Sequence, residues 1–143
     1  MVHPVKIELK GLQEFKRNLD REKSKITRDL ERTTSASLTR IQTGAKRGSA
    51  VDTGRLRASI YNRQEGISGD VYTNVHYAPY IEFGTGNLVK VPDELKEMAE
   101  QFRGRGVRQV NLPARPFMYP AFVKEKPVYI RNIKGILGKS RSV

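Results

Sequence analysis

The chain has 143 residues, of which 37% are hydrophobic and 29% charged, and it contains no cysteine. This length fits one domain with a modest core, and the missing cysteines exclude disulfides and thiolate metal sites. No apolar run approaches the ~20 residues that cross a membrane, and Met1 to Lys6 lack the apolar segment of a secretory signal.

The net charge of +12 lies in the two flanks of the chain. Residues 1–47 and 92–143 each carry a net charge of +6, whereas residues 48–91 are neutral. From Arg103 onward there are ten basic residues and a single acid, Glu125. Such flanks indicate a polyanionic partner, either nucleic acid or an acidic protein surface, or else ordinary solvated faces.

The N-terminal third predicts a short strand and one long helix. Residues 5–9 alternate between apolar and charged, as in a strand with one solvent-facing side. From Leu12 the apolar spacing is mostly three, four or seven, which predicts an amphipathic helix of about 50 Å that ends near Gly44 or Gly48. Residues 33–35 are poor helix formers, so we expect a bend or a partner contact there. A helix this long and this narrowly striped is expected to pack partly on another subunit.

The central segment predicts a capped turn, a hairpin and a helical turn. Asp52 or Thr53 can accept hydrogen bonds from the N–H groups that follow, and Gly54 permits the tight turn that runs through Leu56. Strands are expected at 59–63 and 71–75, joined by a turn at 65–70. A helical turn at 77–83 then precedes the glycine-rich loop 84–86.

The C-terminal part predicts an inserted arm and a last helix. In residues 87–113, Pro92 and two following acids favour a helix start, and Leu95, Met98 and Phe102 share one face. The last helix follows residues 116–122, and Pro127 is expected to kink or interrupt it.

The predicted fold is therefore α+β, a small antiparallel sheet packed by a long N-terminal helix and a C-terminal helix. We expect one domain over residues 1–143, with its core at about 5–86 and 114–137. The arm at 87–113 and a basic tail at 138–143 lie outside that core.

The sequence offers little for catalysis, and we predict no enzyme, cofactor or metal site. The candidates are His3, His76, Asp52 and Glu82, but His76 lacks a sequence-defined nucleophile or orienting carboxylate. No Gly-Lys-Ser/Thr follows the loop 84–86, which argues against a phosphate loop. Glu82 is expected to be a buried or interface carboxylate that pairs with Arg55 or Arg57. A small nuclease using His76 with Glu82 is a minor alternative.

A nonspecific nucleic-acid-binding protein is the main alternative function. Basic residues near glycines and in the tail can neutralise phosphates without reading sequence. They could equally bind acidic patches on neighbouring protein subunits. These residues are Arg103, Arg105, Arg108, Lys134, Lys139 and Arg141.

Three motifs follow the long helix in order: 51–60 (VDTGRLRASI), 77–85 (YAPYIEFGT) and 116–121 (PFMYPA). Together they resemble the tail-component family of lambdoid-type siphophages, whose members are called tail-completion, neck or head–tail joining proteins. The resemblance covers about residues 10–137. One departure is the predicted helix within 87–113, where the family commonly has a short link.

The resemblance implies a structural virion protein that forms a ring, expected to be a hexamer, at the head–tail junction around the DNA channel. Its implied partners are other copies of itself, head-connector or stopper proteins, and tail terminator or tail-tube proteins, with no membrane. No catalytic residue comes with the family. The residues assigned to motifs or interfaces are Asp52, Thr53, Gly54, Leu56, Tyr77, Tyr80, Glu82, Phe83, Gly84, Thr85, Pro116, Phe117 and Pro120.

Overall fold

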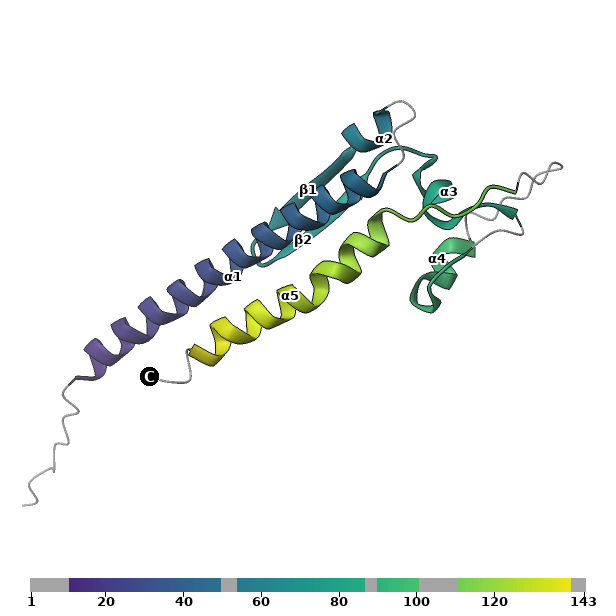
Figure 1. Ribbon diagram of the computed structural model, residues 1–143. Coiled ribbons are helices and arrows are strands. Elements are labelled where there is room, and N and C mark those ends of the chain that lie inside the picture. Colours follow the sequence, from purple (N-terminus) through teal and green to yellow (C-terminus); the bar gives the residue numbers. More distant parts are fainter. Residues whose placement is uncertain (1–10, 50–53, 87–89, 101–110, 140–143) are drawn as a thin grey trace, which may run out of the picture.

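The computed structural model describes residues 11–49, 54–86, 90–100 and 111–139 (Figure 1). The fold is α+β, as predicted. Its elements are α1 (Leu12–Gly48), α2 (Arg55–Ala58), β1 (Ile60–Glu65), β2 (Ser68–Thr73), α3 (Ala78–Phe83), the 3₁₀ turn η2 (Asp93–Leu95), α4 (Lys96–Glu100) and α5 (Met118–Lys139). The strand expected at residues 5–9 lies outside the described residues.

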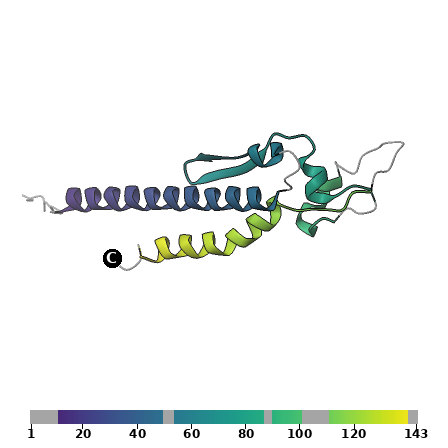
Figure 2. The same ribbon diagram turned by 45° about the horizontal axis from the view of Figure 1, so that its top comes forward.

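The helix α1 is the longest of the described elements, and the hairpin and α5 pack against it. The hairpin and α5 lie on two sides of its C-terminal half, while its N-terminal half extends past the hairpin (Figures 1 and 2). The bend expected at residues 33–35 is absent, because α1 is continuous and straight there (Figure 2). Thr34 instead contacts its own chain: its Oγ1 donates to the Ile67 carbonyl at 3.2 Å and lies 3.2 Å from the Tyr129 hydroxyl.

The hairpin is tighter than expected. The strands pair antiparallel from Ile60–Thr73 to Glu65–Ser68, so the turn comprises only residues 66–67 rather than 65–70. Gly69 allows β2 to approach α1, because a Cβ at this position would lie 2.3 Å from Leu38 Cδ1. The helix and the sheet therefore meet without space for a further side chain.

The helices α1 and α5 run antiparallel and meet at regular intervals of about one turn. A Cβ at Gly48 would lie 3.5 Å from Phe117, and one at Gly44 would lie 3.1 Å from Ala121. Farther along, Glu125 bonds to Ser37 and Arg40, and Tyr129 reaches Thr34. Glycine and alanine at one end thus let the two helix backbones approach closely, and polar groups align the rest.

The core forms where α1, the hairpin and the start of α5 converge. Ile60 and Phe117 are its most completely buried large side chains. Burial of each such side chain contributes about 1.5–3 kcal/mol to the stability of the fold. The buried cluster comprises Ala45, Leu56, Ile60, Val75, Ala78 and Phe117.

The helix α5 continues through Pro127, and Figure 2 shows it changing direction along its length, which agrees with the expected kink rather than an interruption.

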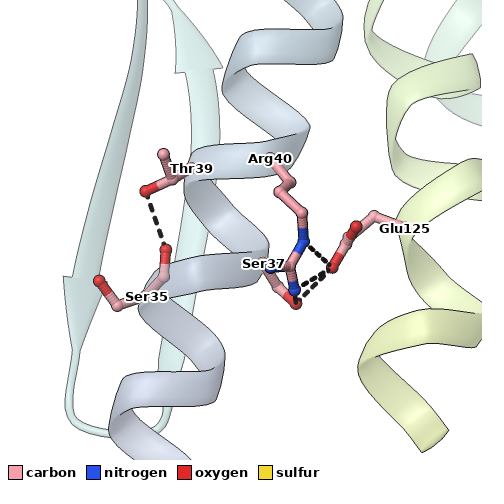
Figure 3. Close-up of polar contacts among 5 residues, drawn as sticks. All are labelled: Ser35, Ser37, Thr39, Arg40 and Glu125. Atoms are coloured by element: carbon pink, nitrogen blue, oxygen red, sulfur yellow. Dashed lines mark hydrogen bonds and ion pairs between the residues drawn. The ribbon is translucent and has the colours of Figure 1, made fainter. Parts of the chain in front are cut away.

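A buried carboxylate joins α5 to α1 (Figure 3). Glu125 Oε1 accepts hydrogen bonds from Ser37 Oγ at 2.7 Å and from Arg40 Nε at 2.9 Å, and Arg40 Nη2 lies 2.8 Å from the same oxygen. Burial raises the pKa of Glu125, but the bonds from Arg40 and Ser37 and the Arg40 charge outweigh it. The pKa of Glu125 therefore lies below its ordinary value of 4.5.

The Glu125 cluster makes stability depend on pH. Because folding lowers the pKa of Glu125, the carboxylate stabilises the fold above its ordinary pKa, and this contribution is lost as the pH falls through the lowered value. We expect the free energy of unfolding of the wild type to fall more between about pH 7 and pH 3 than that of Glu125→Gln. Urea unfolding at each pH measures this free energy. Equal losses of stability in the wild type and in Glu125→Gln would contradict the lowered pKa of Glu125.

Gly54 provides a test of the turn before α2. Its φ is +67° and a Cβ there would meet nothing within 4 Å, so a substitution changes backbone strain without a clash. Gly54→Val should lower the free energy of unfolding by about 1–2 kcal/mol, because this conformation is costly for a β-branched residue. Gly54→Asn is the matched control, since Asn tolerates positive φ. Equal stability of both variants in urea unfolding would refute the turn geometry.

Candidate assembly interface

Glu82 of α3 caps the beginning of α5. Its Oε2 accepts hydrogen bonds from the backbone N–H groups of Phe117 at 2.8 Å and Met118 at 2.9 Å. Its Oε1 accepts a third, from the N–H of Tyr119 at 2.9 Å. The carboxylate is buried, and its negative charge faces the positive end of the α5 helix dipole. We call this arrangement the Glu82 cap.

The Glu82 cap accounts for every unpaired donor at the start of α5. The first four N–H groups of a helix have no partner within it, and here they belong to residues 117–120. Three of them bond to Glu82. The fourth position is Pro120, which has no N–H. Residues 114–117 contain no Ser, Thr, Asp or Asn, so α5 takes its cap from a distant part of the chain.

The partner expected for Glu82 was wrong. Both carboxylate oxygens serve the α5 backbone rather than the guanidinium of Arg55 or Arg57. Arg57 Nε donates instead to the Lys46 carbonyl at 2.9 Å and so ties α2 to the end of α1. The carboxylate is likewise occupied and unavailable as the acidic partner of a catalytic histidine. His76 is exposed, and its ring contacts the Tyr77 ring edge-on at 5.5 Å.

Backbone hydrogen bonds reinforce the contact between the second and third motifs. The Arg115 N–H donates to the Ile81 carbonyl at 2.8 Å, and the Thr85 N–H donates to the Leu112 carbonyl at 3.0 Å. The Leu112 N–H in turn donates to Thr85 Oγ1 at 2.9 Å. The chain therefore leaves and re-enters the fold at neighbouring points on either side of the expected arm.

The remaining motif residues divide between core and surface. Leu56, Phe83, Gly84 and Phe117 are buried, and Tyr77 is half-buried. Tyr80, Pro116 and Pro120 are exposed. Most of the described motif positions therefore hold the fold together, and the exposed group is the part that lies on the surface. Asp52 and Thr53 lie outside the described residues.

An open apolar groove of about 720 Å³ lies between α3, α4 and the start of α5. Phe83 and Phe117 form part of its lining, while Met98 and Phe122 at its edge are about half exposed. Tyr119 Oη donates a long hydrogen bond of 3.5 Å to Glu94 across this region. Partial burial, and then the nearby Glu94 carboxylate, raise the pKa of Tyr119 above its ordinary value of 10.

A second apolar surface lies at the other end of the molecule. Residues 12–25 of α1 are all exposed, including Leu12, Phe15 and Leu19 with exposed fractions of 59%, 64% and 58%. The spacing places these three side chains on one face of the helix. That face continues the stripe that packs on the hairpin and α5 farther along α1. We call it the α1 stripe.

The basic candidates are only partly described. Arg103, Arg105, Arg108 and Arg141 lie outside the described residues, whereas Lys134 and Lys139 are exposed on α5. Within the described ranges, no three His, Asp or Glu side chains gather as metal ligands would. Of the helices in those ranges, none combines the length and hydrophobicity that a bilayer crossing requires.

The sequence interpretation missed the bonds of Glu125 and the groove. One signal for Glu125 was present, because it is the only acid among ten basic residues from Arg103 onward. An isolated acid on a helix with an apolar face indicates a specific partner. The groove had no such signal, because its lining comes from segments far apart in the chain.

The described residues define an α+β protein in which two separated motifs interlock at the Glu82 cap. Residues 13–84 match a family model described as "Bacteriophage HK97-gp10, putative tail-component". The chain belongs to this HK97-gp10-like family of bacteriophage tail components, which confirms the resemblance and implies a place in the virion. No curated protein and no solved structure matches the chain.

The Glu82 cap can be tested by removing the carboxylate. Glu82→Ala should lower the free energy of unfolding by about 2–4 kcal/mol, because it leaves three N–H groups without their acceptor. The exposed Glu65→Ala is the matched control and should stay within about 0.5 kcal/mol of wild type. Urea unfolding compares them, and similar stability of the two variants would refute the cap.

Proposed function

We propose that this tail component acts at the head–tail junction as a structural, non-catalytic protein. Copies of the chain form a closed ring, with six the expected number, around the channel through which DNA leaves. The ring joins the tail to the head by contacting a head-connector or stopper protein on one side and a tail terminator or tail-tube protein on the other.

The observation that carries this proposal is the α1 stripe. Three large apolar side chains, each more than half exposed, lie on a helix segment with no cover from the described part of the chain. Exposed apolar faces of this kind mark interaction surfaces. A tail component functions among other virion proteins, so contact with further subunits explains why the stripe continues beyond the fold that it packs.

The charge on α5 favours nonspecific contact with DNA in the channel. Its exposed basic side chains project from a helix whose one acid, Glu125, is buried and paired with Arg40. This surface therefore carries uncompensated positive charge that can neutralise phosphates without reading sequence. The exposed basic residues are Lys124, Lys126, Arg131, Lys134 and Lys139.

Two measurements test the proposal together. Purified chain should assemble into a closed oligomer as its concentration rises, as followed by native mass spectrometry and electron microscopy. Added to an infected-cell extract that lacks it, the chain should restore the joining of separate heads and tails; an extract from a complete infection is the control. A chain that stays monomeric at every concentration and leaves heads and tails separate would overturn the proposal.

A further inference from the structure

We propose that the ring is built head to tail, with the α1 stripe of one copy seated in the apolar groove of the next. This inference rests on the proposed function and specifies its contact. The stripe comprises Leu12, Phe15 and Leu19. The groove lies between α3, α4 and the start of α5, and Met98 and Phe122 form its accessible edge.

The N-terminal half of α1, which carries the stripe, and the helices α3 and α4, which line the groove, lie at opposite ends of an elongated molecule (Figures 1 and 2). The stripe of one copy therefore cannot reach the groove of the same copy. Contact between two different patches on identical chains is heterologous, and it generates a closed ring whenever the rotation between copies closes. The positions of the two surfaces thus favour a second copy as the occupant of the groove.

The shapes of the two surfaces suit each other. Residues at positions i, i+3 and i+7 of a helix are the anchors by which an amphipathic helix enters an apolar groove, and Leu12, Phe15 and Leu19 have this spacing. The groove volume of about 720 Å³ is several times the ~150 Å³ cavity that holds one benzene molecule. There is accordingly room for more than one anchor side chain.

The charges beside the two surfaces are complementary. Lys16 and Lys23 follow Leu12 and Leu19 by one helical turn and so share their face, and residues 12–25 hold five basic and three acidic groups. Beside the groove, η2 and α4 present Glu94 and Glu97 as exposed acids. Lysines alongside the stripe therefore meet carboxylates alongside the groove. This charge pattern selects the orientation and favours a copy of this chain over an acidic partner.

The chain offers separate substitutions for each surface. Phe15→Glu with Leu19→Glu disables the stripe, and Met98→Glu with Phe122→Glu disables the groove. All four side chains are exposed, so the monomer fold should persist, as checked by circular dichroism and urea unfolding. Ile67→Glu with Ile130→Glu is the matched control, because both residues are exposed and apolar but belong to neither surface.

Mixing the variants identifies the contact. Each disabled variant alone should self-associate more than ~100-fold more weakly than wild type, because two buried anchors are lost. Mixed together, they should form dimers but nothing larger, since each pair retains one intact stripe and one intact groove. The control variant should still form the wild-type oligomer in native mass spectrometry.

Disulfide trapping gives a second readout. The natural chain has no cysteine, so Leu19→Cys with Met98→Cys introduces the only thiols. Mild oxidation should yield a ladder of linked copies up to the ring, whereas either single variant should yield dimers at most.

The outcomes separate this inference from the proposed function. A wild-type ring that survives disabling of the stripe or the groove, or a mixture that forms no dimers, overturns the head-to-tail contact and leaves the ring standing. A wild type that never oligomerises overturns the head-to-tail contact, and one that also leaves heads and tails separate overturns both. If the two disabled variants form dimers only when they are mixed, and the double cysteine variant yields the ladder of linked copies, the head-to-tail contact is established.

Discussion

The bond between the Glu82 carboxylate and the α5 backbone sets the position of everything that follows it. By accepting hydrogen bonds from three N–H groups, Glu82 fixes where α5 begins and places Phe117 in the core. From that start, the contacts of α5 with α1 follow in steps of about one helical turn, ending with Tyr129 against Thr34. An anionic cap suits this task, because it satisfies the backbone donors and the helix dipole together.

The elements with local signals could be predicted from the sequence. The α1 boundaries follow from apolar spacing and the glycine near its end, and the hairpin follows from alternation around a turn. The turn itself was placed too broadly, because Ser68 and Gly69 resemble turn residues. Pairing across the hairpin keeps them in β2, and Gly69 is needed there for close approach to Leu38. Here tertiary packing outweighs local preference.

The long-range polar contacts could not be predicted, because nothing in the neighbouring sequence specifies them. Glu82 and Phe117 are 35 positions apart, and Ser37 and Glu125 are 88 apart. The motif residues were identified, but their roles were not: Glu82 was assigned to an arginine, and Pro120 had no assigned task. In the structure both residues serve the start of α5: Glu82 accepts hydrogen bonds from its first N–H groups, and Pro120 has no N–H that needs an acceptor. A proline is tolerated at the one position of the α5 start that the carboxylate does not serve.

The hydrogen bonds between Thr85 and Leu112 have a consequence for how such a protein can vary. They hold the two ends of the intervening segment together, so the core elements before Thr85 and after Leu112 keep their places whatever the length of that segment. Lengthening a chain segment whose ends are already held costs little, since closure entropy grows only slowly with length. Between Thr85 and Leu112, but outside η2 and α4, the chain is therefore suited to gaining peptides over evolutionary time, and to accepting a grafted epitope or fluorescent reporter in the laboratory.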